Sequence, residues 1–374
     1  MNRRYRWHPG DYELGENEKF YSDMEAQGWR LVSRGAYLSR FAPVEPSAAR
    51  YRVEVSDRNY YAYLEDEDME GAQLAVFADC GWEFVTGRRL LRIFRAPAGS
   101  DAPEFYMDPR QQAATLKTLR RQYLIGWMPA LFSFLFSTLL SSRRWGGLAY
   151  FHRAWVERTA LWLLIIAAAA WLVYVNLYAA WRVGRVIRRM KRGQSLDHNP
   201  RPRRHIHRAV CWVLAGVMAV CGALALAQRW EARTEALPLM TTEPYLVPEE
   251  LGIPGRPTEE SRAAHTGSLL ADYWDVYAEV ESGGGETTWV FQDVYRLRRG
   301  RDARSLAQAL METAAFADQG RSFTAIDPEG LDGAWTTNRL ELVAVKGDLA
   351  AYVVYIGDGF DPAALCRALA AKWG

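Results

Sequence analysis

The sequence predicts a multi-domain membrane protein in which two small α+β domains are separated by a group of membrane-spanning helices. Three observations support this fold class: a duplicated helix–Gly-Trp–strand pattern near the N-terminus, three uncharged apolar runs in the middle, and alternating strand patterns near the C-terminus. A chain of 374 residues is also long enough for two or three folding units. We expect a first domain, a membrane region, an extended proline-rich connector and a last domain at residues 1–109, 120–228, 229–262 and 263–374.

The duplicated pattern near the N-terminus consists of the stretches "MEAQGWRLV" and "FADCGWEFV". In each stretch a glycine follows a helical pattern and suits the left-handed conformation that ends a helix, while the next tryptophan anchors the returning strand. The four residues that we expect to anchor this structural repeat are Gly28, Trp29, Gly81 and Trp82. Helices followed by strands, after an initial strand, make a split β-α-β arrangement. The sequence therefore predicts a ferredoxin-like α+β domain in which both tryptophans are packing residues.

These stretches belong to an ordered set of motifs that also includes "YRVEV", "RIFRAP" and "EFYMDP", followed by apolar runs. In this order the first third of the chain resembles the bacterial membrane-attached family catalogued as domain of unknown function twenty-eight twelve. The resemblance implies a cytoplasmic domain ahead of membrane helices and, by analogy, a PadR-type transcriptional regulator as protein partner. The family has no assigned catalytic residues, so none is transferred. The chain departs from the family pattern at Phe20-Tyr21, where a tryptophan is common, and in the longer linker "APVEPSAAR".

Three uncharged apolar runs in the middle of the chain cover about residues 123–140, 159–181 and 209–227. Each approaches the roughly 20 residues that a helix needs to cross a hydrocarbon core about 30 Å thick. We therefore expect three transmembrane helices.

The basic segment 182–208, between the second and third runs, predicts the orientation. Its one acidic residue is Asp197. Short loops rich in Lys and Arg stay in the cytoplasm, so we expect a multi-pass plasma-membrane protein with a cytoplasmic N-terminus and an extracytoplasmic C-terminus. The basic side chains that we expect to determine topology and to face membrane lipids are Arg185, Arg188, Arg189, Lys191, Arg192, Arg203 and Arg204. A competing signal is the positive charge of the loop between the first two spans, at Arg143, Arg144, Arg153 and Arg158.

The C-terminal region predicts a small α+β domain. Segments 272–280 and 287–297 have strand patterns, 302–316 is an amphipathic helix, and 339–357 is a hairpin that turns at Gly347. A last helix is expected to begin at the Asp361-Pro362 cap.

No motif in the sequence identifies a catalytic site or a cofactor. The chain lacks a phosphate-binding loop, a dinucleotide-binding glycine pattern, a nucleophile elbow and a zinc-protease helix, and its four cysteines do not have the spacing of a zinc site. We expect no cofactor, no metal and no direct binding of nucleic acid. Asp272, Asp275 and Glu279 form a candidate acidic face, which we interpret as the solvated edge of a strand or helix.

These observations favour a non-enzymatic membrane regulatory or sensory protein, in which an outside domain senses a ligand or partner and an inside domain binds a cytosolic protein. An alternative is a membrane enzyme or transport accessory that acts on lipid headgroups at the aromatic, basic loop 145–155, with His152 as its candidate residue. A third interpretation makes the outside domain a scaffold for homo-oligomerisation. The sequence leaves these three alternatives open.

Overall fold

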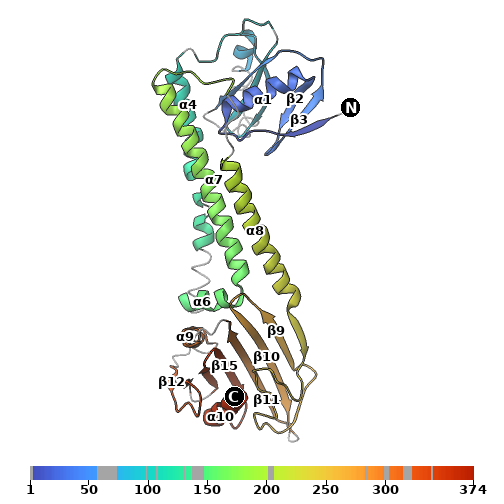
Figure 1. The fold of residues 1–374 in the computed structure, drawn as a ribbon, viewed down its shortest axis with the longest axis vertical. Coiled ribbons are helices and arrows are strands. Elements are labelled where there is room, and N and C mark those ends of the chain that lie inside the picture. Colours follow the sequence, from blue (N-terminus) through green and yellow to red (C-terminus); the bar gives the residue numbers. More distant parts are fainter. Residues whose placement is uncertain are drawn as a thin grey trace. The chain divides into compact units, whose positions relative to one another are not determined.

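The computed structural model describes residues 3–56, 74–97, 99–106, 108–129, 131–136, 147–200, 206–282, 285–298, 303–314, 322–337 and 340–374. The chain forms two compact units (Figure 1). The first unit comprises Met1–Leu131 with Ala170–Cys211, and the second comprises Phe132–Ala169 with Trp212–Gly374.

The first unit contains two successive β-α-β-β repeats. In each repeat the third strand pairs antiparallel with both other strands, which gives sheets of order β1-β3-β2 and β4-β6-β5. The elements of the first repeat are β1 (Arg4–Trp7), α1 (Leu14–Ala26), β2 (Trp29–Arg34) and β3 (Leu38–Pro43). Those of the second are β4 (Arg50–Val55), helical residues 74–79, β5 (Glu83–Arg88) and β6 (Leu91–Ala96).

The predicted mixture of helices and strands in this region is confirmed, but the strand arrangement differs from a single ferredoxin-like sheet. A ferredoxin-like domain has the order β-α-β-β-α-β, whereas the described elements include two strands after each helix as well as one before it. The reason is that each Gly-Trp turn is followed by a complete hairpin, β2–β3 or β5–β6, whose second strand then pairs with the first strand of its own repeat. The duplication is therefore of a whole β-α-β-β unit.

Helix α1 packs on both sheets of the first unit. Its buried Tyr21 and Met24 share one hydrophobic core with Phe41 of β3 and with Tyr51 and Val53 of β4. The same core includes residues of α4 (Pro109–Ile125) and of the end of α7 (Thr159–Lys191): Ala113, Leu116, Leu119, Val183, Ile187 and Met190. The two repeats, α4 and the end of α7 thus form one packed body.

Two helices in the described part of the chain are long and apolar enough to cross a membrane. They are α7 and the Ala209–Glu231 portion of α8 (Ile206–Glu231), and they coincide with the second and third predicted runs. The first predicted run starts at the end of α4, and its residues 137–140 lie outside the described residues. The structure therefore supplies two candidate spans of the three that the sequence predicts.

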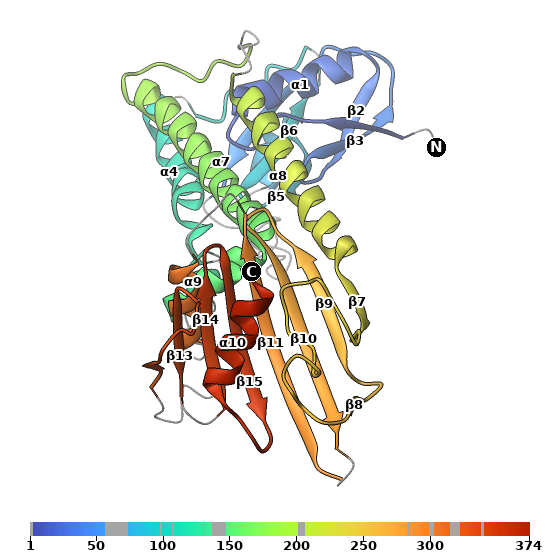
Figure 2. The ribbon, with the colours of Figure 1, turned by 60° about the horizontal axis from the view of Figure 1, so that its bottom comes forward.

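The second unit is built on one antiparallel sheet of nine described strands (Figure 2). Its order is β12-β13-β14-β15-β11-β10-β9-β7, with β8 paired to β10. The strands are β7 (Arg233–Ala236), β8 (Arg256–Pro257), β9 (Arg262–Gly267), β10 (Ala271–Glu281), β11 (Thr287–Leu297), β12 (Thr324–Ala325), β13 (Gly333–Thr336), β14 (Glu341–Lys346) and β15 (Leu349–Ile356). The predicted strands and the hairpin turning at Gly347 are confirmed by β10, β11, β14 and β15.

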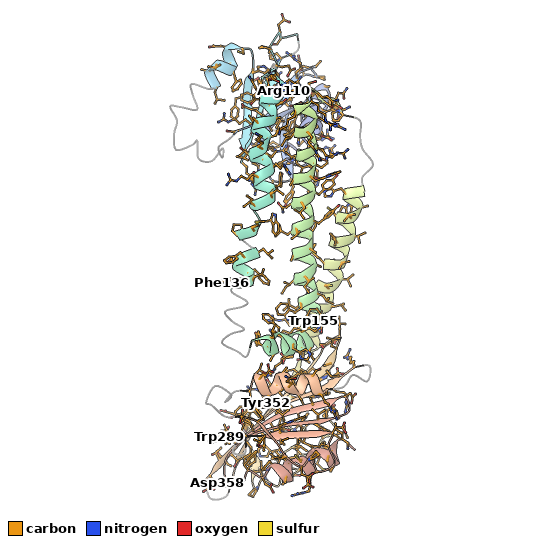
Figure 3. The ribbon with its side chains drawn as sticks, turned by 90° about the vertical axis from the view of Figure 1, so that its left-hand side faces the viewer. Arg110, Phe136, Trp155, Trp289, Tyr352 and Asp358 are labelled. Carbon is orange, nitrogen blue, oxygen red and sulfur yellow. The ribbon has the colours of Figure 1, made fainter. Side chains whose placement is uncertain are left out.

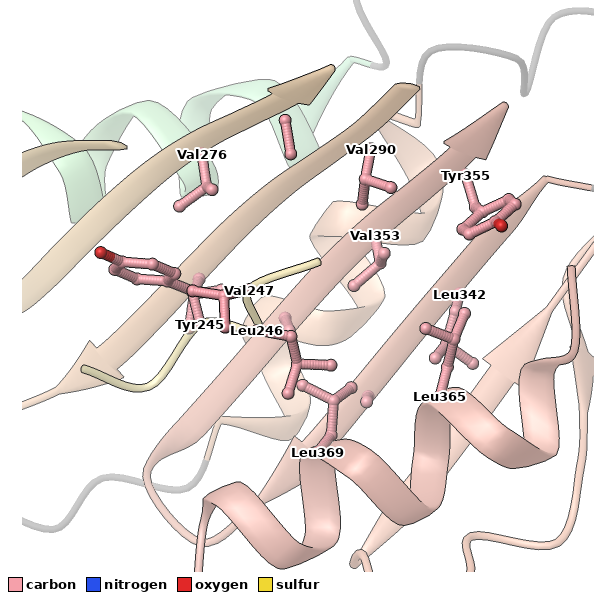
Figure 4. Packing of buried hydrophobic residues seen from close by; sticks show 14 of the residues in the cluster. Tyr245, Leu246, Val247, Val276, Val290, Leu342, Val353, Tyr355, Leu365 and Leu369 are labelled. Carbon is pink, nitrogen blue, oxygen red and sulfur yellow. The ribbon is translucent and has the colours of Figure 1, made fainter. Parts of the chain in front are cut away.

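Helices cover both faces of this sheet. On one face, α10 (Pro362–Lys372) packs its Leu365 and Leu369 against strand residues such as Val353 (Figure 4). On the other face lie α9 (Arg304–Glu312) and α6 (Leu148–Glu157), the helix that directly precedes α7. Asp361 caps α10 by accepting a hydrogen bond from the backbone amide of Ala363, as its Asp-Pro sequence predicts.

The segment 229–262, expected to be an extended connector, is part of the folded domain. It contains β7 and β8, and its Tyr245, Leu246 and Val247 are buried in the same core as α10 (Figure 4). Gln292 of β11 holds this segment, because its side chain bonds both the backbone N–H and the C=O of Leu246. The prolines end secondary structure locally, as expected, but the apolar residues between them cover the sheet.

Candidate functional site

The four repeat anchors lie at the ends of the two helices of the first unit. Gly28 has a φ of +82° and Gly81 a φ of +84°, so both adopt the left-handed conformation that favours glycine. Trp82 is buried, and its indole N–H donates a hydrogen bond of 2.8 Å to the backbone carbonyl of Pro103. Trp29 is half-buried and packs against the main core. The two turns thus share a backbone conformation but place their tryptophans differently.

The basic residues expected to face lipid gather at the end of α7. Those that the structure describes there are exposed: Arg185, Arg188, Arg189, Lys191 and Arg192. Arg203 and Arg204 lie outside the described residues. Arg182, one turn earlier, is instead held by α1, because its guanidinium lies 3.0 Å from the Glu16 carboxylate. The end of α7 therefore carries a solvated cationic surface beside an ion pair that attaches it to α1.

A buried ion pair, which no sequence pattern predicted, joins α1 to the second sheet. The Glu25 side chain is inaccessible to solvent and lies 2.7 Å from the Arg95 guanidinium. Tyr51 and Ser47 also donate hydrogen bonds to its carboxylate, at 2.5 and 3.1 Å. Burial raises the pKa of Glu25, but the bonds from Arg95 and Tyr51 lower it more, so the net pKa lies below the ordinary value. This cluster is fully satisfied and stabilises the fold of the first unit.

The second unit contains a less balanced charge cluster. In the register of β10 and β11, Asp275 and Asp293 stand directly opposite each other. Like charges in directly opposed positions destabilise a sheet. Arg153 of α6 offsets this repulsion, since its Nη2 lies 2.7 Å from Asp293 Oδ2 and its Nε lies 2.8 Å from Oε1 of Glu157, one turn later on α6. The arginine thus ties the helix to the sheet through two carboxylates.

Two stacked tyrosines complete the attachment of α6 to the sheet. The hydroxyl of Tyr273 donates a hydrogen bond to Asp293, and the hydroxyl of Tyr295 donates one to Glu157, both with a length of 2.7 Å. The centroids of the two tyrosine rings lie 4.7 Å apart. Burial raises the pKa of both hydroxyls, so they remain donors at neutral pH. Figure 3 shows Trp155 on α6 and Tyr352 on the sheet below it. These charge-assisted bonds fix the orientation of α6.

Beside this cluster is a cavity of about 730 Å³, within the range of small-molecule sites. The residues that line it come from α6, the first turns of α7, the strands β10, β11 and β15, and the end of α9: Tyr150, Arg153, Ala154, Glu157, Arg158, Leu161, Trp162, Ile165, Asp275, Phe291, Asp293, Thr313, Tyr352, Val354 and Ile356. Asp275 opens into the cavity, and its carboxylate accepts no hydrogen bond from a described residue. Burial, and next the charge of Asp293, raise its pKa.

Sequence reasoning located only part of this site. It assigned Asp275 to a solvated strand edge, and the residue is indeed exposed on β10, but it did not foresee that Asp275 lines a cavity. The candidate His152 is not among the lining residues. The spacing of Arg153 and Glu157 allows an ion pair on one helix face, but only the strand register brings Asp293 to them. Among the described residues, no group of three or more His, Cys, Asp or Glu side chains is arranged to hold a metal ion.

Comparison with known proteins gives a family-model match within the first unit. Neither curated proteins nor solved structures include a match to the chain. Residues 13–128, which contain both Gly-Trp turns and α4, match the family model described as "Protein of unknown function (DUF2812)", so the first third of the chain has the family resemblance that its motifs predicted.

Proposed function

We propose that the chain is an integral membrane regulatory or sensory protein without catalytic activity. In this proposal the domain of the second unit lies outside the cytoplasm and senses a ligand or partner. The N-terminal domain lies inside and binds a cytosolic protein, for which a PadR-type transcriptional regulator is the candidate by analogy with the family resemblance. The membrane is a bacterial plasma membrane, and the cationic end of α7 faces the anionic lipids of its inner leaflet.

The observation that carries the proposal is that α7 contributes to both units. Leu161 and Trp162, in its first turns, line the cavity of the second unit. Val183 and Ile187, near its end, are buried in the core of the first unit. A helix of 33 residues is about 50 Å long, longer than a hydrocarbon core is thick. One continuous helix therefore links the cavity to the N-terminal domain.

The exposure of α7 and α8 supports their placement in a membrane. Only 11% and 6% of their most apolar windows are buried by protein, whereas the core helix of a soluble protein is largely covered. The exposed cations at the end of α7 favour the cytoplasmic side for that end. The N-terminal domain packs on the same end and would share its side, while α8 would return the chain to the outside. The first predicted run, at about residues 123–140, would then supply the third crossing.

A membrane enzyme or transport accessory that acts on lipid headgroups remains a second candidate. The observation that favours it is the carboxylate of Asp275, which opens into the cavity with a raised pKa, as a general acid or base requires. A turnover assay of the full chain with labelled phospholipid, repeated with Asp275→Asn, tests this alternative. Product formed by the native chain and lost in the variant would favour the enzyme.

Labelling of cysteines in intact cells tests the proposed topology. Cys80 is exposed and reports on the N-terminal domain. Cys366 is buried and cannot report on the C-terminal domain, so the exposed Glu286, beside the β10–β11 turn, is replaced by cysteine. We expect an impermeant thiol reagent to label E286C in intact cells and Cys80 only after permeabilisation, with peptide mass spectrometry identifying each site. Labelling of both sites under the same condition would refute the two-sided arrangement.

A further inference from the structure

We infer that the cavity of the second unit binds an amphiphile with a primary ammonium head group and a hydrocarbon chain. This inference names the ligand class of the proposed sensor and, for the route by which the ligand arrives, rests on the proposed membrane placement of α7. Three features of the cavity lead to it: its charge, its aromatic lining and the origin of its apolar wall.

The charge of the cavity favours a cation. Two arginines and three carboxylates line it, which gives one net negative charge when all are ionised. Arg153 is bonded to Glu157 and Asp293, and Arg158 is exposed. The carboxylate of Asp275 is exposed and has no hydrogen-bond donor among the described residues, so solvent reaches it and a ligand can replace that solvent. A ligand that brings both a positive charge and N–H groups satisfies this acceptor, and a primary ammonium does so while a quaternary one does not.

The aromatic lining suits the same group. Four aromatic side chains contribute to the cavity, namely Tyr150, Trp162, Phe291 and Tyr352. Ring faces attract cations, including the ammonium groups of ligands. Phe291 lies near Asp275 on the same face of the sheet. Its cross-strand partner is Tyr277, which is two residues after Asp275 on β10 and therefore shares its face. Its side chain is 41% exposed, so a ligand would bury it.

The apolar wall explains why the ligand carries a hydrocarbon chain. Leu161 and Ile165 belong to the first turns of α7, and Val354 and Ile356 to β15. In the proposed placement, the first turns of α7 begin the membrane span, directly after the exposed Arg158. The cavity would then have its polar floor on the sheet and its apolar side at the level of the acyl chains. An amphiphile enters such a site from the bilayer with its head group toward Asp275.

The binding test uses the full chain in neutral detergent and two ligands that differ only in the head group, dodecylamine and dodecanol. Titration followed by native mass spectrometry gives the affinity of each. We expect the chain to bind the amine at least tenfold more tightly than the alcohol. Asp275→Asn should remove this preference, and Glu281→Gln, an exposed carboxylate on the same strand that does not line the cavity, should retain it. Equal affinities in the native chain, or an unchanged preference in Asp275→Asn, would overturn the inference.

Three further measurements separate the expected result from misfolding and from simple ion exchange. Protection of the buried Cys366 from a thiol reagent shows that each variant has kept its fold. Phe291→Leu, which leaves every charge in place, should weaken amine binding more than alcohol binding. Acidification should weaken amine binding as Asp275 is protonated. The charged groups around Asp275 are Asp293 of β11, Arg262 of β9, and Arg153 and Glu157 of α6.

Nanodiscs distinguish the possible sources of the ammonium group. If phosphatidylethanolamine competes with dodecylamine where phosphatidylcholine does not, the ligand is a membrane lipid. If neither phospholipid competes, the ligand is a single-chain amphiphile, and the head-group chemistry is supported in both cases. Binding in detergent does not depend on topology. If two-sided cysteine labelling is found but the native chain shows no preference for the amine, only the ligand class is refuted. If the amine preference is found but labelling is not two-sided, only the proposed sensor is refuted.

Discussion

At the scale of single residues, Glu25 and Asp275 are two carboxylates in opposite surroundings, since Glu25 is fully buried and Asp275 is exposed at the mouth of a cavity. Burial raises the pKa of each. Glu25 has Arg95, Tyr51 and Ser47 as donors, and they lower its pKa below the ordinary value. Asp275 has no hydrogen-bond donor in the described part of the chain, and the charge of Asp293 raises its pKa further. The first carboxylate therefore stabilises the fold, whereas the second is available to a ligand.

Replacing Arg95 by methionine should destabilise the first unit strongly. A buried charge that loses its partner costs about 3–5 kcal/mol. Arg30→Met is the matched control, because Arg30 contacts the same carboxylate at 3.3 Å but is 40% exposed, and exposed pairs contribute at most about 1 kcal/mol. Hydrogen exchange of peptides from β4 and β6 measures both effects. Similar exchange in the two variants would show that burial of the pair has little energetic weight.

The same pair of variants predicts a reversal of pH dependence. In the native chain the pKa of Glu25 is lowered, so its contribution to stability is present above the pKa of the unfolded chain and is lost as the pH falls through the folded value. Without Arg95, burial dominates and should raise this pKa, so that protonation stabilises the fold. Protection of β4 should thus rise on mild acidification in Arg95→Met, whereas in Arg30→Met it should fall only when the pH drops below the ordinary pKa of a glutamate. A parallel response in both would contradict this assignment.

Cys366 should be inert to thiol reagents in the folded chain. It is buried, and burial raises its pKa to about 11, so little reactive thiolate is present at neutral pH. Since the thiolate is the nucleophile, we expect its labelling to be at least about 100-fold slower than that of the exposed Cys80. Peptide mass spectrometry before and after denaturation measures the ratio. Comparable native rates would mean that α10 leaves the sheet readily.

At the scale of elements, the two helix ends of the repeat share one conformation but differ in their surroundings. A Cβ on Gly28 would lie 3.0 Å from the backbone oxygen of Val44, whereas one on Gly81 would lie 3.2 Å from the hydroxyl of Ser100, which can rotate away. Alanine in the left-handed region costs about 1–2 kcal/mol. We expect Gly81→Ala to cost about that much and Gly28→Ala to cost more. Hydrogen exchange of the β2–β3 and β5–β6 hairpins measures the two losses.

Elements with a strong local signal were predictable from the sequence. The positions of α10 and the β14–β15 hairpin follow from a cap and a turn, and both are confirmed. The attachment of α6 was not predictable, because it depends on a contact between Arg153 and Asp293, 140 positions apart. The prediction that 229–262 is an extended connector was wrong for a similar reason, since the hydrogen-bond partner of its Leu246 is the distant Gln292. Local periodicity contains no information on such pairs.

At the scale of the whole molecule, the proposed signal depends on α7 being one helix. Two alanines inserted after Ala169 rotate the two parts of the helix by about 200° relative to each other, whereas four rotate them by about 400°, a net change of about 40°. Each unit should retain its own fold in both variants. Dodecylamine should change hydrogen exchange in β4 and β6 of the native chain. The change should be smaller in the four-alanine variant and absent in the two-alanine variant. An undiminished response with two would exclude α7 as the connection.

The junction of α8 with β7 also has a consequence for how a ligand is encountered. Ala232 is the one residue between them, and a single residue spans at most about 3.6 Å. The sheet is thus tethered to α8 with almost no slack, and in the proposed membrane it cannot diffuse away from the bilayer surface. Encounter with an amphiphile then becomes a search in two dimensions, and its rate is set by lateral diffusion and surface density in the outer leaflet rather than by bulk concentration.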